Sequence, residues 1–448
     1  MSYPRYAEYG EAEPDWLGTL PSHWSSRRLR FTVSEPLMYG ANEAAVLEDQ
    51  TLPRYIRITD VKADGTLDDD TFRSLEEDIA APYLLQDGDI LLARSGATVG
   101  KSFQYLVSWG RAAYAGYLIR CRLDKSIIFP RFANYYFQTE CYWACIRSTL
   151  IQATIENFSA EKYKDLTLPL PAKDEQQQIA AFLDWKTGQI DALIARKQEL
   201  LEKLKEKRIA VITQAVTQGL NPAAPMRDSG IPWLGQVPQH WDVCQVKRVF
   251  QSTDYGISEA LEPEGRIAVL RMGNIENGKV VLDDLKYIDS VPPELLLRRG
   301  DLLYNRTNSL DLIGKVGMFT GETDPPVSFA SYLVRIRTEA NCVPEFFAYM
   351  LNTEGMLGVA RSNAFIAIGQ CNLNPSRYGQ IRAAIPPKAE QEAIVHHLDD
   401  ETAKLDGLSS KAQSVIDRLT EYRTALITAA TTGKIDVRKM QIPAKKPD

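Results

Sequence analysis

The stretch GATVGKS, residues 96–102, comes closest in this chain to a nucleotide-binding loop. A phosphate-binding loop of the form GxxxxGK followed by Ser or Thr wraps a phosphate with consecutive backbone N–H groups before a helix begins. Ser95 stands where the first glycine of that motif is required, and the residues after Ser102 have the pattern of a strand. The corresponding loop later in the chain ends in Gly314-Lys315, but it has no counterpart of Gly96, and Val316 stands in place of Ser102. We therefore expect no nucleotide site here.

Other groups that could do chemistry also lack the partners that their chemistry needs. The stretch NPSRYG, residues 374–379, resembles the NPP-aromatic motif of amino-methyltransferases, but Ser376 and Arg377 replace the residues that would stack on and orient a flipped base. Neither His23 nor His240 has a nearby carboxylate or nucleophile in the sequence, which favours a structural role for both. The six cysteines form no CxxC pair, so we expect reduced thiols and no metal. The sequence predicts no catalytic centre and no cofactor.

Basic residues on loops next to predicted strands are the better candidates for binding. Arginine can donate two hydrogen bonds to a guanine edge, and arginine and lysine both contact phosphates. A solvated loop charge is the alternative for any single one of them. Such residues lie just past a buried strand, at the end of the polar loop that follows it, or in a strand that precedes a hairpin turn. The candidates for DNA contact are Arg57, Arg94, Lys101, Arg271, Arg306 and Lys315.

These candidates occupy equivalent positions because the chain contains two copies of one module. The phrase WLGTLPSHW at residues 16–24 returns as WLGQVPQHW at 233–241. Hairpin turns are predicted at Asp64-Gly65 and Asn277-Gly278, where Arg57 aligns with Arg271 and Asp60 with Asn274. The strands AGYLIRCRL and ASYLVRIRT match, as do two short helices, PRFANYYFQTE and PEFFAYMLNTE, whose aromatic residues we expect in the core. The strands therefore repeat, while the loops between them differ in length and content.

A long helical pattern follows each module. The first covers residues 174–219 and reads EQQQIAAFLD from Glu175, and the second covers residues 389–433 and reads EQEAIVHHLD from Glu390. Apolar residues in each follow alternate steps of four and three, which is typical of a coiled-coil seam interrupted by charges such as Arg208 and Arg423. The seam residues are Ile190, Ile194, Leu201, Leu204, Val211 and Ala215, then Leu405, Ala412, Ile416, Leu419, Leu426 and Ala430. Helices of roughly 60 Å are too long to pack on a small domain, so we expect them to pair antiparallel about a pseudo-two-fold axis.

The predicted fold is α+β, with two α/β-type modules that contain mixed sheets and are separated by two long antiparallel coiled-coil helices. The expected divisions are a first recognition domain at 1–173, a spacer helix at 174–219, a second domain at 220–388, a spacer helix at 389–433 and a tail at 434–448. The formal net charge is -6, so any site for a polyanion must be local or completed by a partner. No signal peptide or long apolar stretch is present, which predicts a cytoplasmic protein with no membrane contact.

The duplicated order of variable module and EQ-led long helix, with its WLGxxPxHW entry, resembles the specificity (S) subunit of type I restriction-modification systems over essentially the whole chain. This resemblance implies two target-recognition domains, each recognising one half of a bipartite site in double-stranded DNA, and helices that set the gap between the halves. It also implies that the subunit carries two methyltransferase (modification) subunits, joins restriction subunits through the full complex, and has no catalytic centre of its own.

An adaptor that binds protein partners through two duplicated modules and never touches DNA is the alternative from another class. Two equivalent protein sites would keep their loops alike, whereas these loops diverge. The divergence favours recognition of two different half-sites.

Overall fold

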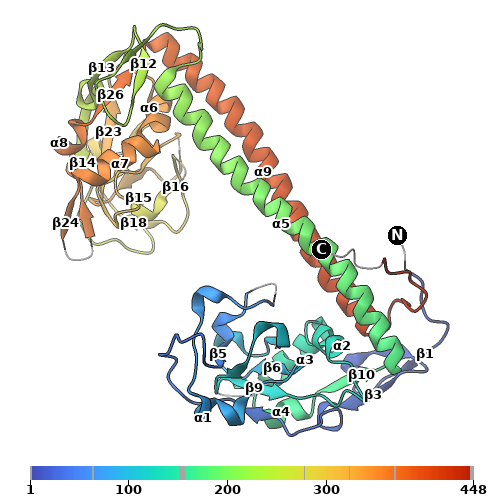
Figure 1. Ribbon diagram of the computed structural model, residues 1–448. Helices are drawn as coiled ribbons and strands as arrows, with labels where there is room; N and C mark the ends of the chain where they lie inside the picture. The colour runs from blue at the N-terminus through green and yellow to red at the C-terminus, as the bar shows by residue number, and fades with distance from the viewer. Residues whose placement is uncertain are drawn as a thin grey trace. The chain divides into compact units, whose positions relative to one another are not determined.

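The computed structural model describes residues 3–62, 65–150, 157–276, 278–321, 323–367 and 370–443. The chain forms two compact units: unit 1 contains Met1–Gln198 and Gln413–Asp448, and unit 2 contains Glu199–Ala412. Each unit holds one module and one part of each of two long helices, coloured green and red in Figure 1. The two predicted hairpin turns include Asp64 and Asn277, which lie outside the described residues.

Unit 1 is built on a four-stranded antiparallel sheet with the strand order β4-β9-β6-β7. Strands β5 and β8 form a parallel pair, and β1 with β2 and β3 with β10 form antiparallel pairs. The strands are β1 (Tyr9–Glu11), β2 (Thr19–Pro21), β3 (Ser25–Arg28), β4 (Met38–Tyr39), β5 (Arg54–Ile56), β6 (Ile90–Ala93), β7 (Ser102–Gln104), β8 (Ala112–Tyr114), β9 (Leu118–Cys121) and β10 (Thr167–Leu170). The helices are α1 (Glu77–Ala80), α2 (Pro130–Tyr136), α3 (Glu140–Leu150) and α4 (Ala160–Lys164). The aromatic residues of α2 are buried in the core, as predicted.

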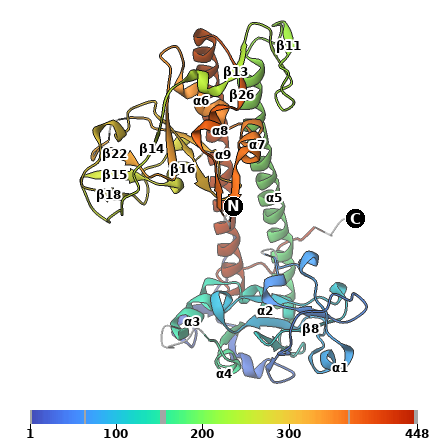
Figure 2. The ribbon, with the colours of Figure 1, turned by 90° about the vertical axis from the view of Figure 1, so that its left-hand side faces the viewer.

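Unit 2 contains a mixed six-stranded sheet with the order β14-β23-β19-β21-β17-β16 and a three-stranded sheet with the order β18-β15-β22. Figures 1 and 2 show β14 between the strand pair β13–β26 and the three-stranded sheet. The strands are β11 (Met226–Asp228), β12 (Gln236–Pro238), β13 (Asp242–Gln245), β14 (Phe250–Tyr255), β15 (Ile267–Leu270), β16 (Ile275–Glu276), β17 (Lys279–Val280), β18 (Lys286–Ile288), β19 (Leu302–Asn305), β20 (Thr307–Asn308), β21 (Val316–Met318), β22 (Val327–Phe329), β23 (Leu333–Thr338), β24 (Phe365–Ala367), β25 (Gln370–Asn372) and β26 (Arg382–Ile385). The helices are α6 (Pro344–Leu351), α7 (Glu354–Asn363) and α8 (Pro375–Gly379).

The pairing of strands confirms the internal repeat. The order β4-β9-β6-β7 in unit 1 matches β14-β23-β19-β21 in unit 2, and each matched pair is antiparallel. The parallel pair β5–β8 likewise corresponds to β15–β22, and the antiparallel pair β3–β10 corresponds to β13–β26. The predicted α+β fold with mixed sheets is therefore confirmed.

A buried ion pair explains why both copies keep Gly-Asp before the central strand. In unit 2, Asp301 is 3% exposed and accepts hydrogen bonds from Arg337 Nε (2.8 Å) and Nη2 (3.1 Å). The Asp301 carboxylate raises the pKa of Arg337 through these bonds. In unit 1, Asp89 accepts from Arg122 in the same way, at 2.9 and 2.8 Å. These pairs join adjacent strands of the sheet beneath the loops that follow.

We predict that Asp301→Asn lowers the free energy of unfolding by about 3 kcal/mol, because it leaves the Arg337 charge without its buried partner. Denaturant unfolding of the full chain, followed by tryptophan fluorescence, measures this change. Asp289→Asn is the matched control, since Asp289 is exposed. Equal stability of the two variants would contradict a stabilising role for the pair.

The two long helices are α5 (Lys173–Gln218) and α9 (Lys388–Thr431). In unit 1 the first part of α5 packs with the last part of α9, where Ile190 and Leu426 share one core (Figure 1). In unit 2 the last part of α5 packs with the first part of α9 in a second hydrophobic core, which contains Ala215 and Ile394. The helices therefore run antiparallel, and the predicted helix-to-helix contact is confirmed.

Charges that interrupt the apolar seam are paired across the two helices. Arg423 Nε donates to Asp191 at 2.9 Å in unit 1, and Arg208 Nη1 donates to Asp406 at 2.6 Å in unit 2. Asp191 and Asp406 are equivalent in the repeat, as are Arg208 and Arg423, since both pairs of positions differ by 215. The two ion pairs are thus copies of each other, one in each unit.

Each long helix ends on the tryptophan turn that begins a module. Gly433 follows α9 with φ +70°, and a Cβ placed on it would lie 2.3 Å from Pro21 Cδ and 3.3 Å from the Trp24 ring. Gly219 follows α5 with φ +74° and approaches Trp241 in the same way, at 3.3 Å. Only glycine combines this left-handed backbone with such close packing.

The N- and C-terminal segments of the chain meet in unit 1. The amide of Asp436 donates to Pro4 O at 2.8 Å, and Gln178 Nε2 on α5 donates to Met440 O at 3.0 Å. Val437 is fully buried in the same core as the start of α5. The described part of the predicted tail is therefore packed against the module.

Replacing Gly433 by alanine should destabilise unit 1 by about 2 kcal/mol, because the left-handed backbone becomes strained and the Pro21 ring must shift. Gly188→Ala is the matched control: Gly188 lies within α5, a Cβ there meets no atom within 4 Å, and alanine should stabilise the helix by about 1 kcal/mol. Thermal unfolding of both variants tests the opposite signs. A Gly433→Ala variant as stable as the parent chain would show that the close approach is not a constraint.

Candidate nucleic-acid interface

Four of the six predicted contact residues lie at the ends of two equivalent hairpins, Arg94 and Lys101 in unit 1 and Arg306 and Lys315 in unit 2. In unit 1, Ala93 N donates to Lys101 O at 2.8 Å and Gly100 N donates to Ala93 O at 3.1 Å. In unit 2, Asn305 and Gly314 form the corresponding bonds, each at 2.9 Å. The loop between these bonds spans residues 94–100 in unit 1 and 306–314 in unit 2. Two loops of different length and content therefore begin and end on the same framework.

Arg94 and Arg306 have matching surroundings at the start of these loops. The Arg94 guanidinium lies over the ring of Tyr39, with its carbon 4.8 Å from the ring centroid, and Arg306 lies over Tyr255 at 4.9 Å. The Nε atoms of both arginines are buried and have no hydrogen-bond partner among the described residues. At the other end of the loops, Lys101 is exposed and Lys315 is partly exposed.

The structure gives Arg57 and Arg271 partners of their own. Arg57 donates to both carboxylate oxygens of the buried Asp60, at 3.1 and 2.7 Å, and this bonding raises its pKa. Arg271 donates to the Asp284 carboxylate at 2.8 Å, while Asn274 Oδ1 accepts from its backbone N–H. Both arginines begin a 3-10 turn, so the predicted alignment of Arg57 with Arg271 and of Asp60 with Asn274 is confirmed.

One connecting segment in each unit brings the predicted arginines towards the same place. In unit 1, Ala115 N donates to Ile56 O at 3.0 Å, next to Arg57, and Arg94 N donates to Tyr117 O at 3.0 Å. In unit 2 the segment 330–332 makes the same two contacts: Ala330 N with Leu270 O at 2.8 Å, and Arg306 N with Tyr332 O at 3.0 Å. The candidates of each unit thus border one segment, although they are far apart in sequence.

The expectation that the two histidines lack a carboxylate neighbour is wrong. His23 Nε2 lies 3.0 Å from Glu175, and His240 Nε2 lies 2.8 Å from Glu390, so both histidines do have carboxylate neighbours, supplied by the first turn of a long helix. These contacts join the tryptophan-containing turn at the start of each module to the long helix that follows the module, and they agree with a structural role for both histidines. The sequence also offered a signal that went unused, since the tyrosines beside Arg94 and Arg306 are repeated in both modules.

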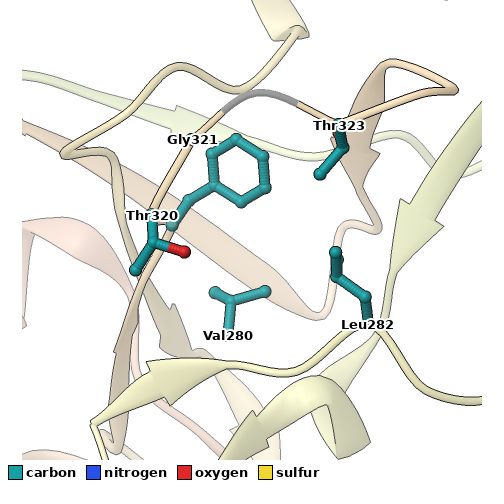
Figure 3. Close-up of a pocket in the computed structure, with 6 residues that line it drawn as sticks. Val280, Leu282, Thr320, Gly321 and Thr323 are labelled. Atoms are coloured by element: carbon teal, nitrogen blue, oxygen red, sulfur yellow. The ribbon is translucent and has the colours of Figure 1, made fainter.

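A shallow cavity of about 210 Å³ in unit 2 is lined by Val280, Leu282, Phe319, Thr320, Gly321 and Thr323 (Figure 3). None of these residues carries a titratable side chain, so the cavity offers no group for acid, base or metal chemistry. Within the described ranges, no cluster of three or more His, Cys, Asp or Glu residues is arranged to hold a metal ion. Across the same residues, no helix has the length and apolar character needed to span a membrane.

Comparison with known proteins gives a consistent result. Residues 54–206 match the family model of the type I restriction modification DNA specificity domain. The EcoKI specificity subunit of Escherichia coli K12 is 25% identical over 374 residues, which cover 80% of this chain and 77% of that one. The StySPI specificity subunit of Salmonella potsdam is 22% identical over 444 residues, which cover 96% and 92%.

Solved structures share the fold. A chain from a study of complex assembly and conformational transition of the type I R-M system has a TM-score of 0.71 at 13% identity, covering 92% of this chain and 98% of that one. The HsdS subunit from Thermoanaerobacter tengcongensis has a TM-score of 0.52 at 14% identity, covering 93% and 98%.

The relatives are specificity subunits of restriction enzymes, which confirms the prediction of a non-catalytic recognition subunit. The duplicated modules, the two long helices and these matches agree with one another: residues 54–206 match the type I restriction modification DNA specificity domain, and the chain as a whole is similar to specificity subunits of type I restriction enzymes.

Proposed function

We propose that the module in each unit recognises one half of a bipartite site in double-stranded DNA. The observation that carries this proposal is the pair of equivalent hairpins, whose framework hydrogen bonds match while loops 94–100 and 306–314 differ. A shared framework with different loops suits two modules that perform one task on two different sequences. An adaptor with two equivalent protein sites does not need this divergence, and the comparisons with specificity subunits do not favour it.

Within each module, we assign DNA contact to the basic residues that flank the loop. Arg94 and Lys101 belong to one half-site, and Arg306 and Lys315 belong to the other. Arg57 and Arg271 are part of the same predicted set, but their guanidinium groups already bind Asp60 and Asp284. Their contribution is therefore to hold the turns beside the connecting segments 115–117 and 330–332 in place.

The long helices serve in this proposal as the spacer between half-sites and as the platform for two methyltransferase (modification) subunits. Support for two equivalent platforms comes from the ion pairs Asp191–Arg423 and Arg208–Asp406, which are copies of each other. A surface repeated by pseudo-two-fold symmetry can bind two copies of one partner. Restriction subunits then join through the full restriction-modification complex.

Selection from a randomised pool of duplex DNA tests DNA recognition directly. The chain purified with its modification subunits should enrich one motif with two defined halves separated by an undefined gap. Because the modules have different loops, the two halves should differ in sequence. Enrichment of no motif by an assembled complex would overturn the proposal and leave the adaptor as the better explanation.

A matched deletion in both helices tests the spacer role. The Asp191–Arg423 pair places residues 192–198 of α5 opposite residues 416–422 of α9, all within unit 1. Removing both heptads keeps the seam and shortens the helix pair by about 10 Å at 1.5 Å per residue, which equals about three base pairs of DNA. The gap in the selected motif should change by that amount, while both halves stay the same.

The control keeps the helix length and changes charge in the same blocks, through Arg196→Gln and Arg418→Gln, two exposed residues. This variant should select the parental gap. A folded deletion variant that selects the parental gap, or that loses preference at either half, would contradict the spacer role.

A further inference from the structure

Each unit exposes a matched group of two tyrosines and one arginine, which we term the tyrosine–arginine cluster. The exposed fractions of the tyrosines are 39% and 67% in unit 1 and 48% and 47% in unit 2. The Tyr39 hydroxyl accepts a hydrogen bond from Ala160 N at 3.0 Å and can still donate its own proton, and such exposure lets the tyrosine hydroxyl groups reach a ligand. The cluster consists of Tyr39, Arg94 and Tyr117 in unit 1 and Tyr255, Arg306 and Tyr332 in unit 2.

The arginine of the cluster is a cation held in place by an aromatic ring. The guanidinium lies over the Tyr39 ring in unit 1 and over the Tyr255 ring in unit 2. Neither guanidinium forms an ion pair with a described carboxylate, although Arg306 Nη1 donates to Ser331 O at 3.2 Å. The Nε atom of each is buried without a hydrogen-bond partner among the described residues. A stacked guanidinium keeps its N–H groups in its own plane, where they can donate to an anion.

Backbone constraints fix the cluster in the same geometry in both units. Gly40, which follows Tyr39, packs so closely that a Cβ on it would lie 2.2 Å from the Tyr114 carbonyl oxygen. Gly256, which follows Tyr255, has the same relation to the Phe329 carbonyl oxygen, also at 2.2 Å. The backbone carbonyl of the second tyrosine of each cluster accepts a hydrogen bond from the arginine backbone N–H at 3.0 Å. The fold therefore fixes the backbone from which the three side chains of each cluster extend.

A second basic residue lies on the segment that binds the backbone of each cluster arginine. The backbone carbonyl of Arg94 accepts from Phe158 N at 2.7 Å, and that of Arg306 accepts from Leu373 N at 2.8 Å. Four residues beyond Phe158 and Leu373, each segment carries another cation in a short helix. These second cations are Lys162 in unit 1 and Arg377 in unit 2.

We infer that the tyrosine–arginine cluster binds the phosphate backbone of duplex DNA in the same way in both half-sites and takes no part in base choice. This inference rests on the proposed function. Two modules that recognise different sequences cannot distinguish them with identical groups, so a repeated group contributes a contact that is independent of sequence. Such contacts fix the orientation of a domain on DNA, while the divergent loops select the bases.

The charge of the cluster favours phosphate over a protein surface as its ligand. Tyrosine and arginine are also frequent at protein interfaces, where the modification subunits would offer an alternative partner. However, the chain carries a net charge of -6, and the arginine of each cluster nevertheless lacks a carboxylate partner among the described residues. A cation that lacks a carboxylate partner, with tyrosine hydroxyl donors beside it, is suited to bind the phosphate groups that repeat along the DNA backbone.

The experiment compares Arg94→Gln and Arg306→Gln, singly and together, in the complex with the modification subunits. Affinity is measured over a range of salt concentrations for a duplex with the selected motif and for one with both halves scrambled. Each substitution should weaken both duplexes by the same factor, on the order of tenfold, and lower the slope of log affinity against log salt by about one. The selected motif should not change.

Three further variants separate charge from structure. Arg94→Lys keeps the cation and should keep the salt slope. Tyr117→Phe, at an exposed position, should weaken both duplexes equally by removing a hydroxyl donor. The matched control is Arg27→Gln combined with Arg266→Gln, two exposed arginines outside the clusters, which should leave affinity within twofold of the parent.

The outcomes distinguish this inference from its alternatives. An altered base preference in Arg94→Gln would assign the cluster to base recognition, and loss of the modification subunits would assign it to protein docking; either result overturns the inference. Unchanged affinity and salt slope in the double variant would also overturn it. A parental complex that enriches no motif would instead overturn the proposed function itself.

Discussion

The rest of the structure depends on how the ends of the two long helices are fixed. In each unit, one helix begins at a glutamate that contacts the histidine of a tryptophan turn, and the other helix ends at a glycine packed against the same turn. Because the helices are antiparallel, both ends of each helix are anchored, one in each unit. Any change in the length of one helix must therefore be matched in the other, or one of these anchors is lost. This coupling makes the helix pair suitable as a spacer of defined length.

The sequence predicted those features that depend on periodicity and repetition. The alternate steps of four and three along residues 174–219 and 389–433 predicted paired helices, and the duplicated phrases predicted matched strands. The alignment of Arg57 with Arg271 and of Arg94 with Arg306 followed from the same repeats, and the structure places each pair in equivalent local geometry.

Contacts between distant segments could not be predicted in this way. Glu175 lies 152 residues from His23, and no local pattern indicates that they meet. In the sequence, Arg208 and Arg423 only interrupt an apolar seam. In the structure, each forms an ion pair with an aspartate of the opposite helix, Asp406 and Asp191 respectively. The sequence made Arg57 and Arg94 equal candidates for DNA contact. In the structure, Arg57 binds the buried Asp60 carboxylate, whereas Arg94 lies over the Tyr39 ring. Such differences arise only when the chain brings remote partners together.

Unit 2 is one continuous stretch of chain, whereas unit 1 is assembled from both ends of the sequence. Val437 fills part of the core of unit 1, and Asp436 binds the backbone of Pro4. During synthesis, which proceeds from the N-terminus, every residue of unit 2 is present before the last segment of unit 1 leaves the ribosome. The core of unit 1 is therefore completed only after every residue of unit 2 has been synthesised, although unit 1 also contains the first part of the chain.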